Sequence, residues 1–401
     1  RPRVQRTFAH HNNKTNGDNI SMSDPTGRLN SLDAFRGFTI AAMVLVNNPG
    51  DWSNLYSQLA HAPWHGWTFT DAIFPFFLFI GGVSMALSLG RLAAAGADKP
   101  KLLLKLAKRA LLIFLIGFLL NLIPYFNFDK VRIPGVLQRI ALCTLLAAPI
   151  VVYCGWRMQL AIIAFLLTVY SALMLFYPVP GIGAGVLEPG KDFGAWIDRM
   201  VLDGHMWVQS KTWDPEGLFS TLPALCSQLF GVLAGRFLLS KIGRTEQIVW
   251  MLLAGLLCLW LGVILDTVLM PINKSLWTPS YCLLMTGWAL LLFSAFFWLL
   301  DVNPYPAVRE AAARWTHPFK IYGMNALFIF AFSGLVAKML GFIKLAQPDG
   351  SMLSLGRSLY APIRDLPIGA VNTSLLHALL FNACMFAIAW FMWRRKWFVK
   401  V

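Results

Sequence analysis

Long apolar segments alternate with short polar ones along almost the whole chain. A helix that crosses a bilayer needs roughly 20 residues. We identify about ten apolar segments near that length, at residues 32–49, 68–90, 105–127, 136–154, 157–177, 219–240, 247–269, 279–300, 319–340 and 373–393. Because a helix satisfies its own backbone hydrogen bonds in lipid, the pattern predicts an all-α fold. We expect a polytopic membrane helix bundle of about ten transmembrane helices, with no soluble domain.

Composition supports this class of protein. Of the 401 residues, 57% are hydrophobic and 13% are charged, whereas soluble domains carry about 25% charged residues. A formal net charge of +15 would suggest nucleic-acid binding in a soluble chain. Here the cations lie mostly between the apolar segments, where they set membrane topology. The composition therefore argues against a nucleic-acid partner and indicates contact with membrane lipid.

The first 27 residues are polar and basic and have no apolar core of the kind found in a cleaved signal peptide. We expect a disordered tail at 1–27, followed by a single transmembrane domain at 28–401.

Lysine and arginine are unevenly divided between the two sets of loops. One set of loops is rich in lysine and arginine. The loops of the other set are longer but contain fewer cations, and residues 49–67 contain none. Because cytoplasmic loops carry the excess of lysine and arginine, we expect both termini in the cytoplasm and the His61 loop outside it. The cation-rich set consists of Arg91, Lys99, Lys101, Lys105, Lys108, Arg109, Arg157, Arg236, Lys241, Arg244, Arg309, Arg314, Lys320, Arg394, Arg395, Lys396 and Lys400.

The most informative polar group lies between the first two apolar segments. His61 occupies the connecting loop, Asn47 ends the first segment, and Asp71 begins the second. Ionisable groups held between membrane helices are costly and tend to mark a site. A carboxylate can fix the tautomer of an imidazole and an amide can hold a reacting oxygen. The set suits a general base, or a histidine that accepts an acyl group itself.

A metal site is the less favoured interpretation of this loop. His61 and His65 are four residues apart, so one helical turn would present both on one face, but the sequence offers no third ligand. The six cysteines are scattered in or beside apolar segments without metal-ligand spacing and are typical of small core residues. We therefore predict no metal.

Four further polar segments stand at the ends of apolar ones: Asp129–Arg139, Asp214–Gly217, Pro271–Trp277 and Gly323–Ala326. Together with Ser31–Gly37, the His61–Gly66 loop and Thr70–Gly82, they occur in an order that resembles one family. That family comprises the lysosomal heparan-α-glucosaminide N-acetyltransferase and its bacterial relatives. The resemblance covers most of the chain from Ser31 to the C-terminal Arg394–Phe398 segment. We expect no counterpart of the luminal domain that precedes these helices in the lysosomal member, and this expectation favours a bacterial inner-membrane protein.

The resemblance implies roles for individual residues. It implies that His61 is the active-site histidine, with Asn47 and Asp71 as its catalytic companions. Family members commonly have asparagine where this chain has His65, so we do not expect His65 to be essential. The predicted substrate-binding residues are Trp64, Asp214, Glu216, Asn273 and Asn325.

The resemblance also implies two substrates, acetyl-CoA as donor and an amino sugar or glycan as acceptor, and it suggests a homodimer. The chain has no glycine-rich phosphate loop, so the phosphates of CoA would rest on arginines and helix N-termini. The candidate residues for binding the donor are Arg36, Arg109 and Arg236 on the cytoplasmic side, together with Arg132 and Arg139, which we expect nearer the outer end and for which lining of the channel is the alternative role.

The implied activity is transfer of an acetyl group from cytoplasmic acetyl-CoA to a glucosamine-type amine outside the cytoplasm, with His61 as the base. An acetyl-histidine intermediate is the competing scheme. Two other functions remain open at this point: a sugar transporter or flippase, and O-acylation of an envelope glycan. No internal repeat of the kind that many transporters contain is visible in the sequence.

Overall fold

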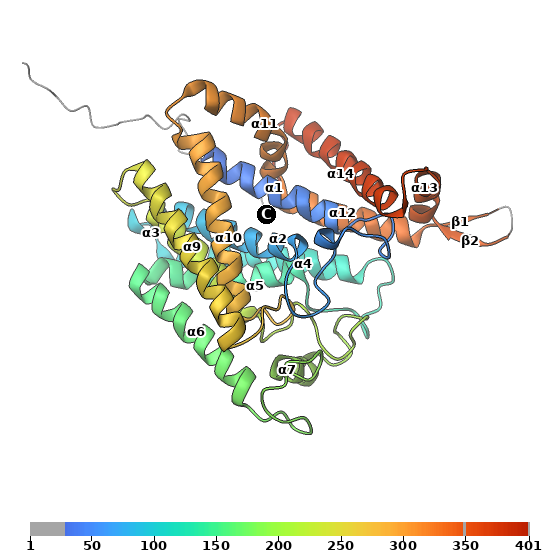
Figure 1. Cartoon of the computed structure of the whole chain (residues 1–401), viewed down its shortest axis with the longest axis horizontal. Coiled ribbons are helices and arrows are strands. Elements are labelled where there is room, and N and C mark those ends of the chain that lie inside the picture. Colours follow the sequence, from blue (N-terminus) through green and yellow to red (C-terminus); the bar gives the residue numbers. More distant parts are fainter. Residues whose placement is uncertain (1–28, 348–349, 400–401) are drawn as a thin grey trace, which may run out of the picture.

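The computed structural model describes residues 29–347 and 350–399, which fold into a bundle of helices (Figure 1). The predicted tail at 1–27 lies outside the described residues. The α-helices are α1 (Asn30–Val46), α2 (Phe69–Met85), α3 (Arg91–Ala94), α4 (Lys99–Leu122), α5 (Val136–Tyr153), α6 (Trp156–Phe176), α7 (Phe193–Leu202), α8 (Thr221–Leu238), α9 (Arg244–Val268), α10 (Pro279–Phe297), α11 (Pro306–Met324), α12 (Ala326–Phe342), α13 (Leu355–Arg364) and α14 (Ala370–Arg394). A small antiparallel hairpin joins β1 (Lys344–Ala346) to β2 (Met352–Ser354).

The helices confirm the predicted fold class. Seven helical segments in the described ranges are long and apolar enough to cross a membrane. The bent pair α11 and α12 adds an eighth if it is counted as one broken span. The seven are Phe69–Ala94, Val136–Tyr153, Trp156–Phe176, Thr221–Leu238, Arg244–Val268, Pro279–Val302 and Ala370–Arg394.

The expected count of about ten spans is not confirmed, for reasons that are local. The helix α1 has 17 residues, fewer than the roughly 20 that a span needs. The first half of α4 carries several of its cations, including Lys105 and Lys108. The segment predicted as one helix at 319–340 is instead broken at Asn325, where α11 and α12 meet at 74°.

Glycines let several helices approach at backbone distance. A Cβ atom added at Gly82 of α2 would lie 1.9 Å from the carbonyl oxygen of Gln228, and one at Gly231 of α8 would lie 1.9 Å from that of Phe79. In the same way, α1 and α11 meet at Gly37 and Gly323. Such small-residue contacts are typical of helix packing in membranes. They fix α2 and α8, whose first residues border the candidate site, as one unit.

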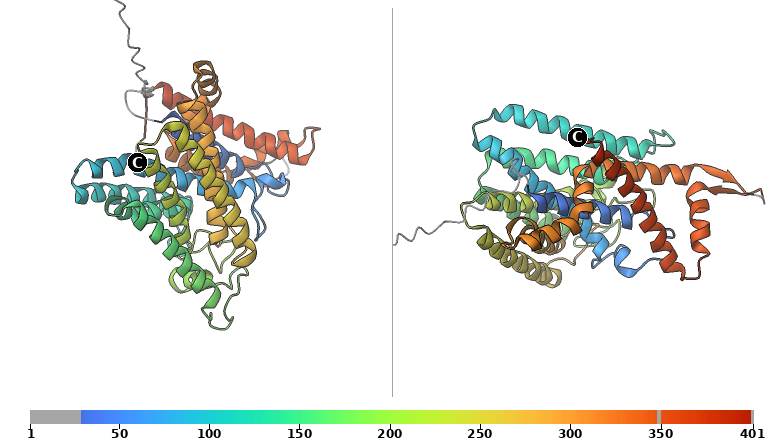
Figure 2. Two further views of the ribbon diagram at one scale, coloured as in Figure 1. Left: turned by 60° about the vertical axis from the view of Figure 1, so that its left-hand side comes forward. Right: turned by 90° about the horizontal axis from the view of Figure 1, so that it is seen from above.

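The long connection between α6 and α8 forms a layer over one end of the bundle. Figures 1 and 2 show α7 and its flanking loops gathered at this end, whereas the β1–β2 hairpin projects from another side. A small apolar cluster that includes Tyr170, Phe193 and Leu276 holds this layer against α6 and the 270–278 loop. We call this end of the bundle the His61 end, because the His61 loop also lies there.

Candidate active site

The start of α2 holds His61 through a buried carboxylate. Asp71, which is 1% exposed, accepts hydrogen bonds at Oδ2 from the backbone N–H of Thr68 and of Ala62, each at 3.0 Å. Together with Thr68 it forms a capping box on the first turn of α2. Its other oxygen, Oδ1, lies 2.7 Å from Nδ1 of His61. The helix start that the sequence predicts thus also fixes the imidazole.

The contact assigns the tautomer of His61. A carboxylate only accepts hydrogen bonds, so Nδ1 of the ring carries the proton and Nε2 has the free electron pair. The His61 side chain is 49% exposed, whereas Asp71 is buried beneath it. The imidazole is therefore reachable from solvent at the His61 end and can act as a base there.

Lys274 completes this group, although the sequence analysis did not select it. Its Nζ lies 3.0 Å from Nδ1 and 3.3 Å from Nε2 of His61, and 3.6 Å from Oδ1 of Asp71. Burial lowers the pKa of the Lys274 ammonium below its ordinary value, while Asp71 and Glu216 oppose that shift. A cation in a set of loops otherwise poor in cations was the signal that could have identified it.

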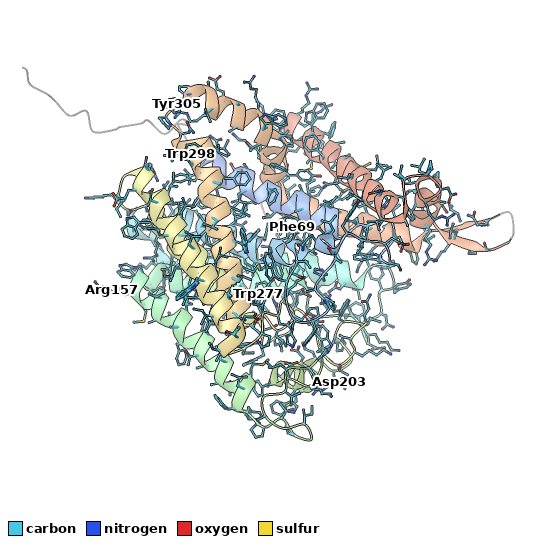
Figure 3. The ribbon with its side chains drawn as sticks, viewed as in Figure 1. Phe69, Arg157, Asp203, Trp277, Trp298 and Tyr305 are labelled. Atoms are coloured by element: carbon cyan, nitrogen blue, oxygen red, sulfur yellow. The ribbon has the colours of Figure 1, made fainter. Side chains whose placement is uncertain are left out.

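The loop that carries Lys274 is tied to the His61 loop. The backbone N–H of Gly66 donates to the carbonyl of Ile272 at 2.7 Å, and Gly66 pairs with Asn273 as a short parallel bridge. Asn273 is fully buried, and its Oδ1 accepts a hydrogen bond from the N–H of Leu276. In Figure 3, Trp277 from this loop and Phe69 at the start of α2 both lie in the central part of the view.

A second charged group lies beside the first. Arg132 donates from Nε and an Nη atom to both oxygens of Asp214, at 2.8 and 2.5 Å, and to Glu216 at 2.5 Å. The two carboxylates raise the pKa of Arg132 despite its burial. Burial alone would raise the pKa of Glu216, but Arg132, Arg139 and Lys274 outweigh it and lower that pKa. The charge of Glu216 thus interacts with Arg132 and also with Lys274, which in turn contacts His61.

Arg139 supplies a buried charge at the start of α5. It is 1% exposed, lies 5.3 Å from the ring centre of Trp277, and donates to the carbonyl of Gly217 and the hydroxyl of Ser220. Its Nε and one Nη atom have no hydrogen-bond partner within the described part of the chain. Its charge acts on Glu216, Lys274 and Tyr281. It therefore belongs to the His61 end.

Trp64 lies at the His61 end and contacts the layer formed by the connection between α6 and α8. Its indole N–H donates to the carbonyl of Leu187 at 2.8 Å. Its ring lies edge-on to Trp213 with ring centres 5.0 Å apart. Trp213 directly precedes Asp214, so an aromatic wall borders the charged residues at the His61 end.

Within the described residues, no side-chain hydrogen bond links Asn47 or Asn325 to His61. Asn47 is exposed at the end of α1, and no side-chain hydrogen bond links it to His61 or Asp71 in the described ranges. Asn325 lies at the corner between α11 and α12, where its amide donates to the carbonyl of Trp397 and accepts from the N–H of Val399. The structure therefore places Asn325 apart from the other predicted substrate-binding residues.

Two of the predicted arginines, Arg36 and Arg236, lie toward the opposite end of the bundle, and Arg109 lies near the middle of α4. Arg36 contacts Asp33 at 3.4 Å and the Ser84 hydroxyl at 2.6 Å. Arg236 donates to two carbonyls at the end of α5, at 2.7 and 2.8 Å, and so caps that helix. Arg109 is exposed on α4. The five arginines predicted to bind the donor therefore do not lie together, and Arg132 and Arg139 are at the His61 end.

The fold and the site together define a class of protein. It is a membrane helix bundle that presents a half-exposed histidine, fixed by a buried carboxylate, next to charged and aromatic side chains. A family model described as "Heparan-alpha-glucosaminide N-acetyltransferase, catalytic" matches residues 28–247, which is more than half of the chain. The chain belongs to this family, as its sequence motifs predict.

Two curated relatives carry the same name. The heparan-alpha-glucosaminide N-acetyltransferases of Homo sapiens and Mus musculus are each 32% identical to the chain over 358 residues, which is 76% of the chain. The alignment covers 52% of the human protein and 53% of the mouse protein. The chain thus spans about half the length of these relatives. His61, Asp71, Arg132 and Glu216 lie within the residues that the family model matches, and Lys274 lies beyond them.

Proposed function

We propose that residues 28–401 form a transmembrane acetyltransferase domain that moves an acetyl group from acetyl-CoA to the amine of a glucosamine-type sugar. The observation that carries the proposal is the half-exposed imidazole of His61, held by the buried Asp71 carboxylate with Nε2 left to act as a base. Membership of an N-acetyltransferase family supports the same reaction. The printed names of the relatives support an amino-sugar acceptor.

In the proposed reaction, the amine nitrogen of the acceptor attacks the carbonyl carbon of the thioester. The new C–N bond forms, the C–S bond breaks, and Nε2 of His61 takes the amine proton and passes it to the departing CoA thiolate. Asp71 keeps the ring in the required tautomer during this transfer. Asn47 is exposed at the end of α1 and is assigned the carbonyl oxygen of the thioester. An acetyl-histidine intermediate would instead give ping-pong kinetics.

The proposal assigns the sugar acceptor and the CoA phosphates to different ends of the bundle, with the long pantetheine arm of CoA lying between them and carrying the thioester to His61. The acceptor lies at the His61 end, beside Trp64, Asp214 and Glu216, where an aromatic face and carboxylates suit an amino sugar. The CoA phosphates are assigned to the opposite end, which holds Arg36 and Arg236, with Arg109 exposed nearer the middle of α4. The distribution of lysine and arginine supports a cytoplasmic location for that end, with both termini there and the His61 loop outside, in a bacterial inner membrane. The homodimer suggested by the family resemblance stays a prediction.

The test measures acetyl transfer by the purified protein in lipid nanodiscs. Acetyl-CoA and glucosamine are supplied together, release of the CoA thiol is followed, and N-acetylglucosamine is identified by mass spectrometry. His61→Ala should lower the rate about 10²–10⁴-fold if the residue is the base. The matched control is His65→Ala, which changes the neighbouring exposed histidine of the same loop. Thiol release that requires no amine acceptor, or a His61→Ala variant with near-normal rate, would overturn the proposal.

A further inference from the structure

Lys274 is held beside His61 by an ordered loop rather than by its own flexible side chain alone. The loop is fixed on one side by the pairing of Gly66 with Asn273 and on the other by Trp277, whose indole N–H donates to the Ser227 hydroxyl at 3.0 Å. The Lys274 side chain is 20% exposed. Its ammonium therefore faces the imidazole from a defined direction. Lys274 is the only lysine or arginine in residues 270–278.

The charges around Lys274 come from several elements. Asp71 belongs to α2, Glu216 to the connection that precedes α8, and Arg139 to α5. His61 contributes the ring that lies 3.0 Å away at Nδ1. The two carboxylates favour the charged form of the lysine, so a positive charge stands next to the imidazole. Burial and Arg139 act in the opposite direction on the pKa of Lys274.

The two neighbours of His61 have opposing effects on a proton at Nε2. A carboxylate hydrogen-bonded to an imidazole favours the imidazolium, because opposite charges attract. A lysine ammonium at about 3 Å disfavours the imidazolium, because like charges repel strongly at that distance. An imidazole that already holds both protons accepts none from a substrate. Asp71 alone would thus fix the orientation of the His61 ring but would also favour its protonated form, which cannot act as a base.

On the basis of the proposed acetyl transfer, we propose that Lys274 is a positioning residue that keeps His61 neutral and oriented, with Nε2 ready to accept a proton. The ring is half-exposed and is otherwise held by its bond to Asp71, so the ammonium also limits its rotation into solvent. Lys274 is assigned no bond to either substrate, and its Nζ lies 3.0 Å from Nδ1 and 3.3 Å from Nε2 of the ring. Its effect passes through His61.

The kinetic test compares Lys274→Met, which removes the charge, with Lys274→Arg, which keeps it. The control is Lys191→Met, at an exposed lysine paired with Glu188 in the outer layer. For Lys274→Met we expect kcat to fall on the acidic side of its pH profile, by up to about tenfold at the lowest pH, and to approach the wild-type value at alkaline pH, with KM for acetyl-CoA nearly unchanged. We also expect the acidic limb of kcat/KM to move up by about one pH unit. Lys274→Arg should leave that limb in place. A Lys274→Met variant with a wild-type pH profile would overturn the inference.

A second measurement separates failure of this inference from failure of the proposed function. The chain has 7 histidines, so the ring signals of histidine-labelled protein can be followed by NMR, and the His61 signal is the one lost in His61→Ala. Its titration midpoint should rise by about one pH unit in Lys274→Met and stay in place in Lys191→Met. An unchanged midpoint in Lys274→Met refutes the inference even if acetyl transfer is confirmed. If the wild type transfers no acetyl group, the proposed function fails, and with it the catalytic role of Lys274. The NMR titration midpoint of His61 then tests only whether the Lys274 charge acts on the His61 ring.

Discussion

Replacing Asp71 by asparagine gives the sharpest test of the His61 arrangement. In the wild type, Oδ2 of Asp71 accepts from the N–H groups of Ala62 and Thr68, and Oδ1 faces Nδ1 of His61 at 2.7 Å. In Asp71→Asn, the amide oxygen must stay with the two backbone donors, because a buried N–H without a partner is costly. The new NH₂ group then points at Nδ1 and donates to it. The ring proton moves to Nε2, which is the atom that has to act as a base.

The size of the effect follows from that change of tautomer. A catalytic histidine held in the wrong tautomer by an Asp→Asn change loses about 10⁴-fold in kcat in the serine proteases. We expect a loss of about 10³–10⁴-fold for Asp71→Asn, which is roughly 4–5.5 kcal/mol of barrier. The backbone hydrogen bonds survive, so we expect a loss of folding stability of only about 1–3 kcal/mol. Activity should therefore fall far more than stability.

The assay is CoA thiol release with acetyl-CoA and glucosamine, together with thermal unfolding followed by tryptophan fluorescence. Asp365→Asn is the matched control, because the Asp365 carboxylate is exposed and pairs with its neighbour Arg364. The control should keep wild-type activity. If Asp71→Asn keeps more than about a tenth of the wild-type rate while remaining folded, the tautomer argument is wrong.

Three further predictions concern the packing and the charges around the site. Gly231→Ala brings a Cβ atom to 1.9 Å from the Phe79 carbonyl, so it should lower the free energy of unfolding by about 1–3 kcal/mol. Gly334→Ala, which meets no atom within 4 Å, should leave the melting temperature unchanged or raise it. Arg132→Met leaves the buried Asp214 carboxylate and the Glu216 carboxylate without their cation. It should lower the free energy of unfolding by about 3–5 kcal/mol, and an unchanged denaturant midpoint would contradict this. Burial raises the pKa of Asp198 in α7 to about 7, so its contribution to stability is complete below its ordinary pKa and is lost as the pH rises through about 7. Asp198→Asn should therefore melt higher than wild type near pH 8 but not near pH 3, and an equal shift at both values would contradict the prediction.

The pairing of His61 with Asp71 was within reach of the sequence because both residues are local to one helix start. They are ten residues apart, the carboxylate stands in the first turn of a predicted helix, and a first-turn acid commonly caps the chain that precedes it. The same reasoning could not find Lys274, which is 213 residues from His61. Nor could it pair Arg132 with Glu216, since these contacts depend on how α2, α5 and α8 pack.

The apolar pattern predicted where helices lie better than where they end or bend. Both α11 and α12 are helical in pattern, and nothing in Gly323–Ala326 forces a break, because helices can continue through glycine and asparagine. The break at Asn325 depends on contacts from the distant C-terminal segment. The weakly apolar first half of α4 shows the converse: a helix forms there although its lysines make it a poor span by composition.

The corner at Asn325 has a practical consequence for experiments on this chain. The side-chain NH₂ of Asn325 donates to the carbonyl of Trp397, and its amide oxygen accepts from the backbone N–H of Val399, so one side chain holds the C-terminal segment at two points. A fluorescent reporter or an affinity handle inserted between Trp397 and Val399 would interrupt these contacts at the junction of α11 and α12. A labelling strategy that leaves the catalytic body undisturbed should place its reporter on the projecting β1–β2 hairpin instead (Figure 1).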